Sequence, residues 1–391
     1  MKEKKKVAIL LPWLKMGGTN KIALHFMKEL AEYCDVTLIL SQNIGELLEQ
    51  LPENIHLMID QMIDFKTILK DDLKHFRFGL LIKDVMYYAR IKMKRDNVDN
   101  YRYIVQRNDF ISDTEFDCAI SYHGQSPERL LNLIYRTHAK KKAAWIHGDF
   151  NNPTEHYRRM ERYYGQLDHM FFVSNPTMES CLAKMSLDRK KCSVYYNPID
   201  KNEILEKAEL PCEPEFESEY INLLTVGRVS SEKGQDMIPA ITRNLMNAGH
   251  NVRWYIVGDG DARSIVERNI EKYNVEDHVV LLGTKTNPYC YMKACDIYVQ
   301  PSYTEGYSTT ICEAGMLGKA IVGTKPSGGI RDQITDGEDG LIVDATVEGL
   351  TDGIQKLIED RVLCTNFGQD IQKKNFEGKG EIQKFLAFLA V

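Results

Sequence analysis

Two segments of the chain share one pattern, in which a short apolar strand is followed by a loop with glycines and then by an amphipathic helix. The first covers residues 7–32 and opens with the strand Val7–Leu11, and the second covers residues 221–248 and opens with Ile221–Val226. Strands that are apolar at every position are typical of parallel sheets covered by helices on both faces. The pattern therefore predicts an α/β protein with two such sheets.

Further apolar runs supply strands for both halves of the chain. A chain of 391 residues is too long for one ordinary core, so two domains of similar size are expected. The stretch 197–219 combines prolines with an acidic run and has no periodicity, which indicates a domain boundary. We expect doubly wound, Rossmann-like domains over 1–200 and 201–375, with a helix over 376–391 that returns to the first domain. The remaining expected strands are Val36–Leu40, Cys118–Ser121, Lys142–Ile146, Met170–Val173, Arg253–Val257, Val279–Leu282, Ile297–Gln300, Ala320–Gly323 and Leu341–Val343.

Composition and charge exclude several classes of protein. The formal net charge of -6 argues against a dedicated nucleic-acid binder. The 9 cysteines contain no C-x-x-C pair, which indicates reduced thiols in a cytosolic protein rather than disulfides or a zinc site. The apolar run at the N-terminus is short and lacks a cleavage site, and no stretch of about 18 apolar residues occurs. We therefore expect a cytoplasmic protein without a membrane span.

The loop that follows the strand Ile221–Val226 carries two cations between glycines. Its sequence is Gly-Arg-Val-Ser-Ser-Glu-Lys-Gly over Gly227–Gly234. Arg228 can bind phosphate with its planar fork, Lys233 adds a compact charge, and the glycines allow the backbone to approach a ligand. The loop lacks the Gly-Lys-Ser/Thr ending of a Walker A motif. Taken alone, such an Arg/Lys pair is also compatible with an ordinary solvated loop.

A second polar segment lies downstream, between the strand Ile297–Gln300 and a helix expected to begin around Ser308. It contains Glu305 in the loop and Glu313 in the second turn of the helix. Ser308, Thr309 and Thr310 are expected to offer free backbone N–H groups, which attract a phosphate. Because carboxylates accept hydrogen bonds from sugar hydroxyls, two of them beside a phosphate site are consistent with a bound nucleotide sugar.

These motifs resemble family 4 of the retaining glycosyltransferases, which have the GT-B fold of two Rossmann-like domains facing across a cleft. The Gly-Arg…Lys-Gly loop followed by Glu-x7-Glu carries the resemblance. It is strong over residues 197–345 and weaker over 7–30 and 142–149, and residues 50–115 match nothing. Supporting motifs are Asn197-Pro198-Ile199-Asp200, Val257-Gly258-Asp259-Gly260, Ser327-Gly328-Gly329-Ile330 and Asp339-Gly340-Leu341-Ile342-Val343.

The resemblance implies roles for individual residues of the second half. Arg228 and Lys233 would bind the donor diphosphate, Glu305 the hydroxyls of the donor sugar, and Glu313 the ribose. The family's later Gly-Gly-x-x-Glu has Asp332 in place of the Glu, so no role is carried over to that position. Backbone groups are implied at Gly306, Tyr307, Ser308, Thr309 and Thr310 for sugar and phosphate, at Gly227 for the diphosphate, and at Gly283 and Lys285 for the base.

The first half contributes weaker candidates. Gly17 and Gly18 match a glycine pair that approaches the donor phosphate in the family, although ordinary loop glycines would look the same. His147 follows the strand Lys142–Ile146 and matches a histidine that contacts the donor sugar; a structural histidine is the alternative. For the acceptor, the candidates are Asp149, which is also suited to cap the next helix, and His123 at another strand end.

The activity implied by the resemblance is retaining transfer of a hexose or N-acetylhexosamine from a nucleotide-diphosphate sugar. UDP is the expected nucleotide, and the acceptor is a hydroxyl of a glycan, lipid-linked or polymer substrate in bacterial surface polysaccharide synthesis. No metal or cofactor is expected, because the cations can neutralise the diphosphate. Alternatives are an NAD-dependent oxidoreductase, given the incomplete fingerprint Gly258-x-Gly260, a GT-B epimerase or phosphorylase, and a non-catalytic nucleotide-binding protein. Asp259-Gly260-Asp261 is interpreted as a turn rather than a metal motif.

Residues 65–95 carry an amphipathic pattern with a basic edge. Apolar residues recur at helical spacing from Phe65 to Leu80, beside a stripe that includes Lys70 and Lys74. Such a pattern is suited to the surface of an anionic membrane, and we expect a peripheral contact of this kind. The alternative is a helix that packs on its own domain and leaves a solvated basic edge.

Overall fold

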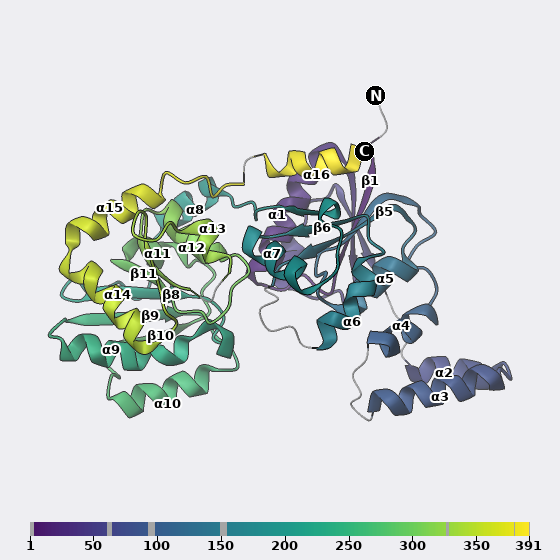
Figure 1. Ribbon diagram of the computed structural model, residues 1–391, viewed down its shortest axis with the longest axis horizontal. Coiled ribbons are helices and arrows are strands. Elements are labelled where there is room, and N and C mark those ends of the chain that lie inside the picture. The colour runs from purple at the N-terminus through teal and green to yellow at the C-terminus, as the bar shows by residue number, and fades with distance from the viewer. Residues whose placement is uncertain are drawn as a thin grey trace. The chain divides into compact units, whose positions relative to one another are not determined.

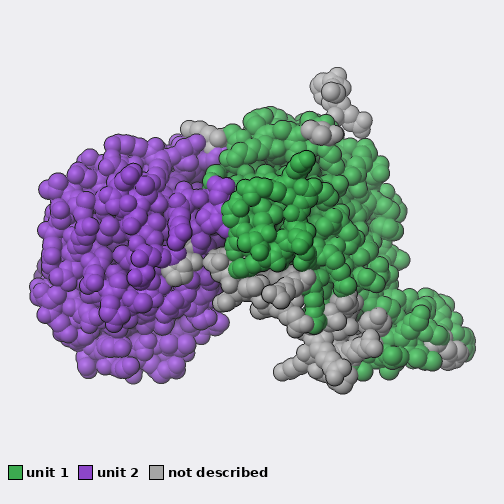
Figure 2. Space-filling model, viewed as in Figure 1, with its two compact units in different colours: residues 1–173, 178–196, 380–391 green, residues 174–177, 197–379 purple. Residues whose placement is uncertain are grey.

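The computed structural model describes residues 4–60, 65–92, 98–148, 155–325, 328–378 and 380–390. The chain forms two compact units, coloured separately in Figure 2. The first comprises Met1–Val173, Met178–Tyr196 and Gly380–Val391, and the second comprises Ser174–Thr177 and Asn197–Lys379. Within the described ranges, no helix is both long enough and apolar enough to cross a bilayer.

The first unit is built on a seven-stranded parallel sheet with the order β3-β2-β1-β4-β5-β6-β7. The sequence did not predict the two edge strands, because β3 leaves His56 and Leu57 exposed and β7, Cys-Ser-Val, is only half-buried at every position. The strands are β1 (Lys6–Leu11), β2 (Asp35–Leu40), β3 (Ile55–Ile59), β4 (Phe116–Ser121), β5 (Ala139–Ile146), β6 (His169–Phe172) and β7 (Cys192–Val194).

The helices labelled in Figure 1 and a cluster of aromatic side chains complete the first unit. The helix α1 begins at Gly18, directly after Gly17. Its Phe26 packs edge-on against Trp145 of β5 and against Phe385 of α16, with ring centroids 5.0 and 5.4 Å apart. The helices are α1 (Gly18–Tyr33), η1 (Glu46–Gln50), α2 (Phe65–Lys74), α3 (Phe78–Lys92), α4 (Val98–Gln106), α5 (Pro127–Arg136), α6 (Glu155–Tyr164), α7 (Asn175–Lys184), η2 (Arg189–Lys191) and α16 (Glu381–Ala390).

The second unit has a six-stranded parallel sheet with the order β10-β9-β8-β11-β12-β13. Its strands are β8 (Ile221–Val226), β9 (Val252–Val257), β10 (Val279–Gly283), β11 (Ile297–Gln300), β12 (Ala320–Thr324) and β13 (Leu341–Val343). Its helices are α8 (Lys201–Ala208), η3 (Ser231–Lys233), η4 (Gln235–Met237), α9 (Ile238–Asn247), α10 (Arg263–Tyr273), α11 (Tyr289–Ala294), α12 (Thr309–Met316), α13 (Ile330–Gln333), α14 (Val347–Glu359) and α15 (Arg361–Ile371). The confirmed fold is therefore two parallel α/β sheets.

Alternate residues of the central strands supply two cores in the second unit. Leu223 and Trp254 belong to one buried cluster, and their neighbours Leu224 and Tyr255 belong to another. Because both faces of the sheet are covered, most positions of these strands are apolar, which is why the sequence predicted them as strands. The expected linker is partly helical, since α8 lies within it.

Candidate functional site

The loop Gly227–Gly234, which we call the phosphate loop after its expected role, begins where β8 ends and is packed onto the turn that follows β9. Gly227 donates its amide to the Val257 carbonyl (2.9 Å), and Val229 donates to the Asp259 carbonyl (3.0 Å). A Cβ atom at Gly258, where φ is +142°, would lie 1.9 Å from the Gly227 carbonyl oxygen. The glycine at position 258 is thus required by contact with the loop, which explains Gly258 without a dinucleotide.

Asp259 and its neighbours form a turn. Its carboxylate accepts a hydrogen bond from the Gly260 amide (2.7 Å) and lies 3.5 Å from the Arg263 guanidinium. Across the described ranges, no three His, Cys, Asp or Glu side chains are grouped in a way that could hold a metal ion. The positive charge described beside Asp259 is that of the Arg263 side chain.

Arg228 extends from the phosphate loop into solvent and pairs with a carboxylate of the same loop. Its Nη2 lies 2.7 Å from Glu232 Oε1, and the two side chains are 70% and 35% exposed. Partial burial raises the pKa of the Glu232 carboxyl, but a hydrogen bond from its own amide and the charges of Arg228 and Lys233 outweigh burial, so the net pKa is lowered. Glu232 is therefore ionised at neutral pH. The sequence analysis assigned no part to it.

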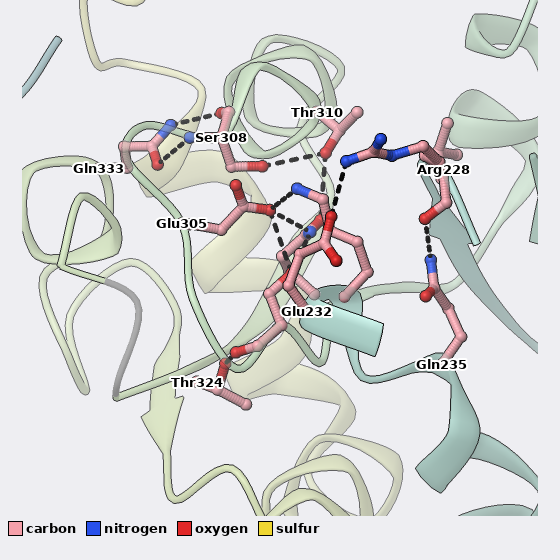
Figure 3. Close-up of polar contacts among 12 residues, drawn as sticks. Arg228, Glu232, Gln235, Glu305, Ser308, Thr310, Thr324 and Gln333 are labelled. Carbon is pink, nitrogen blue, oxygen red and sulfur yellow. Dashed lines mark hydrogen bonds and ion pairs between the residues drawn. The ribbon is translucent and has the colours of Figure 1, made fainter. Parts of the chain in front are cut away.

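Lys233 lies deeper and meets the first glutamate of the downstream motif. Its Nζ is 2.5 Å from Glu305 Oε1, and the same oxygen accepts hydrogen bonds from Gln300 Nε2 (3.0 Å) and Ser302 Oγ (3.1 Å). The Glu305 side chain is only 10% exposed. Figure 3 shows these contacts converging on one carboxylate oxygen. The structure thus brings together two predicted residues that are 72 positions apart in the chain.

The start of α12 differs in one respect from the expectation. The Ser308 amide is not free for a phosphate, because it donates to the side-chain oxygen of Gln333 (3.0 Å), whose Nε2 donates back to the Ser308 carbonyl (2.6 Å). Thr310 is also engaged by its hydroxyl, which donates to Gln300 (3.1 Å). For the amides of Thr309 and Thr310, the first two of the helix, no acceptor is found within the described ranges. Of the three amides expected to attract a phosphate at this helix end, only those of Thr309 and Thr310 remain candidates.

Gly306 is held through its carbonyl. The oxygen accepts hydrogen bonds from Ser174 Oγ (2.8 Å) and Thr177 Oγ1 (3.3 Å), which lie in a short segment that belongs to the second unit. A Cβ atom at Gly329 would lie 1.8 Å from this same oxygen, so the backbone at Gly329 lies close to the backbone of the loop that contains Gly306. The polar residues Ser174 and Thr177 gave no signal in the sequence.

Glu313 and the residues expected near the base lie on neighbouring elements. Glu313 Oε1 accepts a hydrogen bond from the Tyr289 hydroxyl of α11 (3.4 Å). Gly283 ends β10 with a φ of +68°, and its carbonyl accepts the Gly258 amide (2.9 Å). Lys285 directs its Nζ to the Glu213 carbonyl (3.2 Å), so this side chain is engaged by residues before β8.

His147 of the first unit is a neutral histidine with a defined tautomer. Burial lowers its pKa to about 3, with a further contribution from His123. Its Nε2 lies 2.9 Å from the Tyr122 carbonyl oxygen. Because a carbonyl only accepts, Nε2 carries the proton and Nδ1 keeps a lone pair. Nδ1 is thus suited to accept a hydrogen bond from a sugar hydroxyl.

The surroundings of His147 are apolar and partly shaped by a glutamine that the sequence analysis missed. The Trp145 ring lies almost parallel to the imidazole (10°, centroids 6.4 Å apart). Gln125 accepts the Gly148 amide (2.6 Å) and fixes the backbone after His147. Burial lowers the pKa of His123 to about 4, and its Nε2 has no hydrogen-bond partner within the described ranges.

The remaining candidates of the first unit are Gly17, Gly18 and Asp149. Gly17 precedes α1, and a Cβ atom there would meet no atom within 4 Å, so the position is open. Gly18 is the first residue of α1. Asp149 lies outside the described residues.

Comparisons with known proteins relate the sequence of the second unit to one family. Residues 206–374 match the family model described as Glycosyl transferases group 1. The chain is 28% identical over 200 residues to the N-acetylgalactosamine-N,N'-diacetylbacillosaminyl-diphospho-undecaprenol 4-alpha-N-acetylgalactosaminyltransferase of Campylobacter jejuni. The matched region covers 50% of this chain and 52% of the relative. It is 24% identical over 211 residues to the capsular polysaccharide biosynthesis glycosyltransferase CapM of Staphylococcus aureus, covering 53% of this chain and 54% of CapM. The chain thus spans about half the length of the curated relatives it matches.

The likeness to solved structures extends over the whole chain. The crystal structure of HepE from Anabaena in complex with UDP and glucose superposes with a TM-score of 0.72 at 17% identity, and 99% of each chain is covered. At this identity the likeness concerns the fold. Residues 206–374 therefore match the glycosyl transferases group 1 family, and the chain as a whole has the GT-B fold.

Proposed function

We propose that this chain is a retaining glycosyltransferase that uses a UDP-sugar as donor. It moves a hexose or N-acetylhexosamine to a hydroxyl of a glycan, lipid-linked or polymer acceptor in the synthesis of a bacterial surface polysaccharide. The names of the Campylobacter jejuni and CapM relatives, which refer to a diphospho-undecaprenol-linked sugar and to capsular polysaccharide, support the acceptor class. The crystal structure of HepE, which is a complex with UDP and glucose, supports the donor class.

The observation that carries the proposal is the ion pair between Lys233 and Glu305. A cation suited to phosphate lies 2.5 Å from a carboxylate that Gln300 and Ser302 also hold. All three contacts fall on Oε1, and no described residue donates a hydrogen bond to Glu305 Oε2. Oε2 is thus able to accept from donor-sugar hydroxyls while Lys233 and the nearby Arg228 face the diphosphate.

The mechanism follows from these charges. The acceptor oxygen forms a bond to the anomeric carbon on the face from which the diphosphate leaves, and the bond from that carbon to the phosphate oxygen breaks. The acceptor proton passes to a phosphate oxygen, so no protein nucleophile is needed. Arg228 and Lys233 stabilise the negative charge that develops on the leaving group. His147, uncharged at neutral pH, orients a sugar hydroxyl through Nδ1.

A screen of nucleotide sugars tests the proposal directly. Hydrolysis of UDP-, GDP- and ADP-sugars is followed by release of the nucleoside diphosphate, and we expect one UDP-sugar to be consumed fastest. Proton NMR of the first product formed with an added acceptor should show the anomeric configuration of the donor. Consumption of no donor, together with a melting temperature raised by NAD rather than UDP, would favour the oxidoreductase alternative instead.

We also propose that the protein works at the inner face of the cell membrane, through the helices α2 and α3. These helices lie side by side in the first unit. Their distribution of side chains is the reverse of the usual one, because acidic side chains are buried and apolar ones are exposed. Asp72 and Asp84 are fully buried, and Arg107 of the neighbouring region lies 2.5 Å from Asp72 and 3.4 Å from Asp84. Among the described side chains of these helices and the turn between them, most exposed ones are apolar or basic; they include Leu73, Phe76, Ile82, Val85 and Met86, together with Lys70, Lys74 and Lys83.

The exposed apolar side chains of α2 and α3 favour contact with an anionic membrane over the alternative, in which the apolar face packs on the protein's own domain. An exposed apolar surface with a basic rim is complementary to acidic headgroups above acyl chains. Phe76 is the most exposed of the apolar residues at 76%, and it follows α2 with a φ of +53°. Glycine adopts this φ without strain, so Phe76→Gly removes the side chain without harm to the backbone.

Liposome flotation with phosphatidylglycerol and phosphatidylcholine vesicles tests the surface. We expect binding that requires the anionic lipid, weakens in high salt and falls sharply in Phe76→Gly. The control is Val362→Ser, because Val362 of α15 is similarly exposed at 71% but lies in the second unit. Equal flotation of wild type and Phe76→Gly would contradict the proposal. So would a concentration-dependent dimer that Phe76→Gly abolishes, since this surface would then bind a second copy.

A further inference from the structure

The four charges around the phosphate loop cancel. Arg228 and Lys233 each carry one positive charge, and each lies beside a carboxylate, Glu232 at 2.7 Å and Glu305 at 2.5 Å. A diphosphate would bring additional negative charge to a group of side chains with no net charge. The two carboxylates therefore decide how strongly the cations can attract a phosphate.

The two ion pairs differ in how firmly they are held. Glu305 is 10% exposed and is fixed by Gln300 and Ser302 as well as by Lys233. Glu232 and Arg228 form a pair at the surface, with Arg228 70% exposed. An exposed pair contributes little to stability and exchanges easily with ions from solution. The Arg228–Glu232 pair is thus the one that a ligand can open.

The backbone of both partners is nevertheless fixed. The Glu232 carbonyl accepts the amides of Tyr303 (2.9 Å) and Thr304 (3.4 Å), and the Arg228 carbonyl accepts Gln235 Nε2 (2.9 Å). Figure 3 shows the Arg228 guanidinium reaching toward Glu232 beside Glu305. Opening the pair therefore requires a rotation of side chains and no rearrangement of the loop.

We propose that Glu232 is a positioning residue that occupies the Arg228 guanidinium in the ligand-free protein and is displaced from it by the donor diphosphate. The exchange replaces a carboxylate by a phosphate at the same guanidinium and makes or breaks no covalent bond. It rests on the proposed function, because it takes a nucleoside diphosphate as the ligand of Arg228. Glu232 then weakens binding of the diphosphate and speeds its release after transfer, while it keeps Arg228 close to the site.

Calorimetric titration of Glu232→Gln tests this role. The glutamine keeps the shape of the side chain and removes its charge, so the nucleoside diphosphate that binds wild type, chosen from UDP, GDP and ADP, should bind about two- to fivefold more tightly. The matching monophosphate should bind equally well to both proteins. The control is Asp370→Asn, which removes the same charge from an exposed pair with Lys373 (2.6 Å) on α15 and should leave both affinities unchanged.

The same substitution in an Arg228→Ala background separates a specific role from a general effect of charge. If Glu232 acts through Arg228, the gain in affinity disappears in this background. A gain that persists there, or a Glu232→Gln protein that binds the diphosphate no more tightly than wild type, would overturn the inference. Failure of the wild type to bind any of the three diphosphates is a different result, since it would overturn the proposed function as well.

Discussion

The two units present different chemistry at the positions where candidate residues lie. In the second unit, the candidates are charged and paired, and they sit on a backbone locked by close contacts such as that between Gly258 and the Gly227 carbonyl. In the first, the central candidate is a neutral histidine among aromatic rings, and Gly17 faces open space. The second unit is suited to a charged diphosphate, and the first to uncharged sugar hydroxyls.

Removing a charge from the second unit should have the largest effect. Lys233→Ala is expected to lower turnover by roughly 10²-fold or more, because a donor to the leaving diphosphate is lost in the transition state. The measurement is steady-state release of the nucleoside diphosphate at saturating donor. Lys373→Ala, which removes an exposed lysine from α15, serves as the control. Near-normal turnover of Lys233→Ala would show that the second unit does not act through this charge.

The backbone is tightly packed at Gly258 and open at Gly17, so replacing these two glycines should affect stability differently. Gly258→Ala is expected to destabilise the protein by about 2–4 kcal/mol, because it adds an atom 1.9 Å from the Gly227 carbonyl at a positive φ. Gly17→Ala should change stability by less than about 1 kcal/mol, since nothing lies within 4 Å of the added atom. Chemical denaturation of both variants measures the difference. Similar stability losses would show that the two loops are equally constrained.

The pH dependence of stability should report the first unit. Burial lowers the pKa of His123 and His169 to about 4 and that of His147 to about 3. The unfolded chain, with an ordinary histidine pKa near 6.5, then binds more protons than the native protein, so stability falls as pH decreases from about 6.5 to about 3. Urea denaturation at pH 7.5 and 5.5 tests this, and His169→Gln should reduce the slope. Equal stability at the two pH values would contradict burial of these histidines in neutral form.

The smallest effect is expected at His147. Its replacement by alanine removes one hydrogen bond between neutral groups, which is worth about 0.5–1.5 kcal/mol, and KM for the donor should rise up to about tenfold. The melting temperature is measured in parallel, because the imidazole also bonds to the Tyr122 carbonyl. If His147→Ala lost as much turnover as Lys233→Ala, the proposed difference between the charged residues of the second unit and the neutral His147 of the first would be wrong.

The sequence predicted the elements that are buried on both faces and much less of what lies at the surface. The strands β8 and β11 were predicted to the residue, because most of their positions are apolar and buried. The edge strand β3 exposes His56 and Leu57, which obscures the pattern. In α2 and α3, periodicity indicated an apolar face, but burial of Asp72 and Asp84 depends on Arg107 from farther along the chain.

The site shows the same limit. Local motifs identified Arg228, Lys233 and Glu305, since loops after buried strands and helix starts can be recognised from short sequences. The partners of these residues could not be predicted, because they depend on tertiary contacts. Gln333, which takes the Ser308 amide, lies 25 positions away. Glu232 is adjacent to a predicted residue, and only its distance from the Arg228 guanidinium assigns it a part.

The most direct test of the account compares a nucleoside diphosphate with its monophosphate. Calorimetric titration of UDP and UMP into the wild type and into Arg228→Ala/Lys233→Ala measures what the second phosphate contributes. The account predicts that UDP binds the wild type more tightly than UMP and that the double variant removes the difference. If the wild type binds UDP and UMP equally well, or if the double variant keeps the preference for UDP, these two cations do not hold the donor diphosphate.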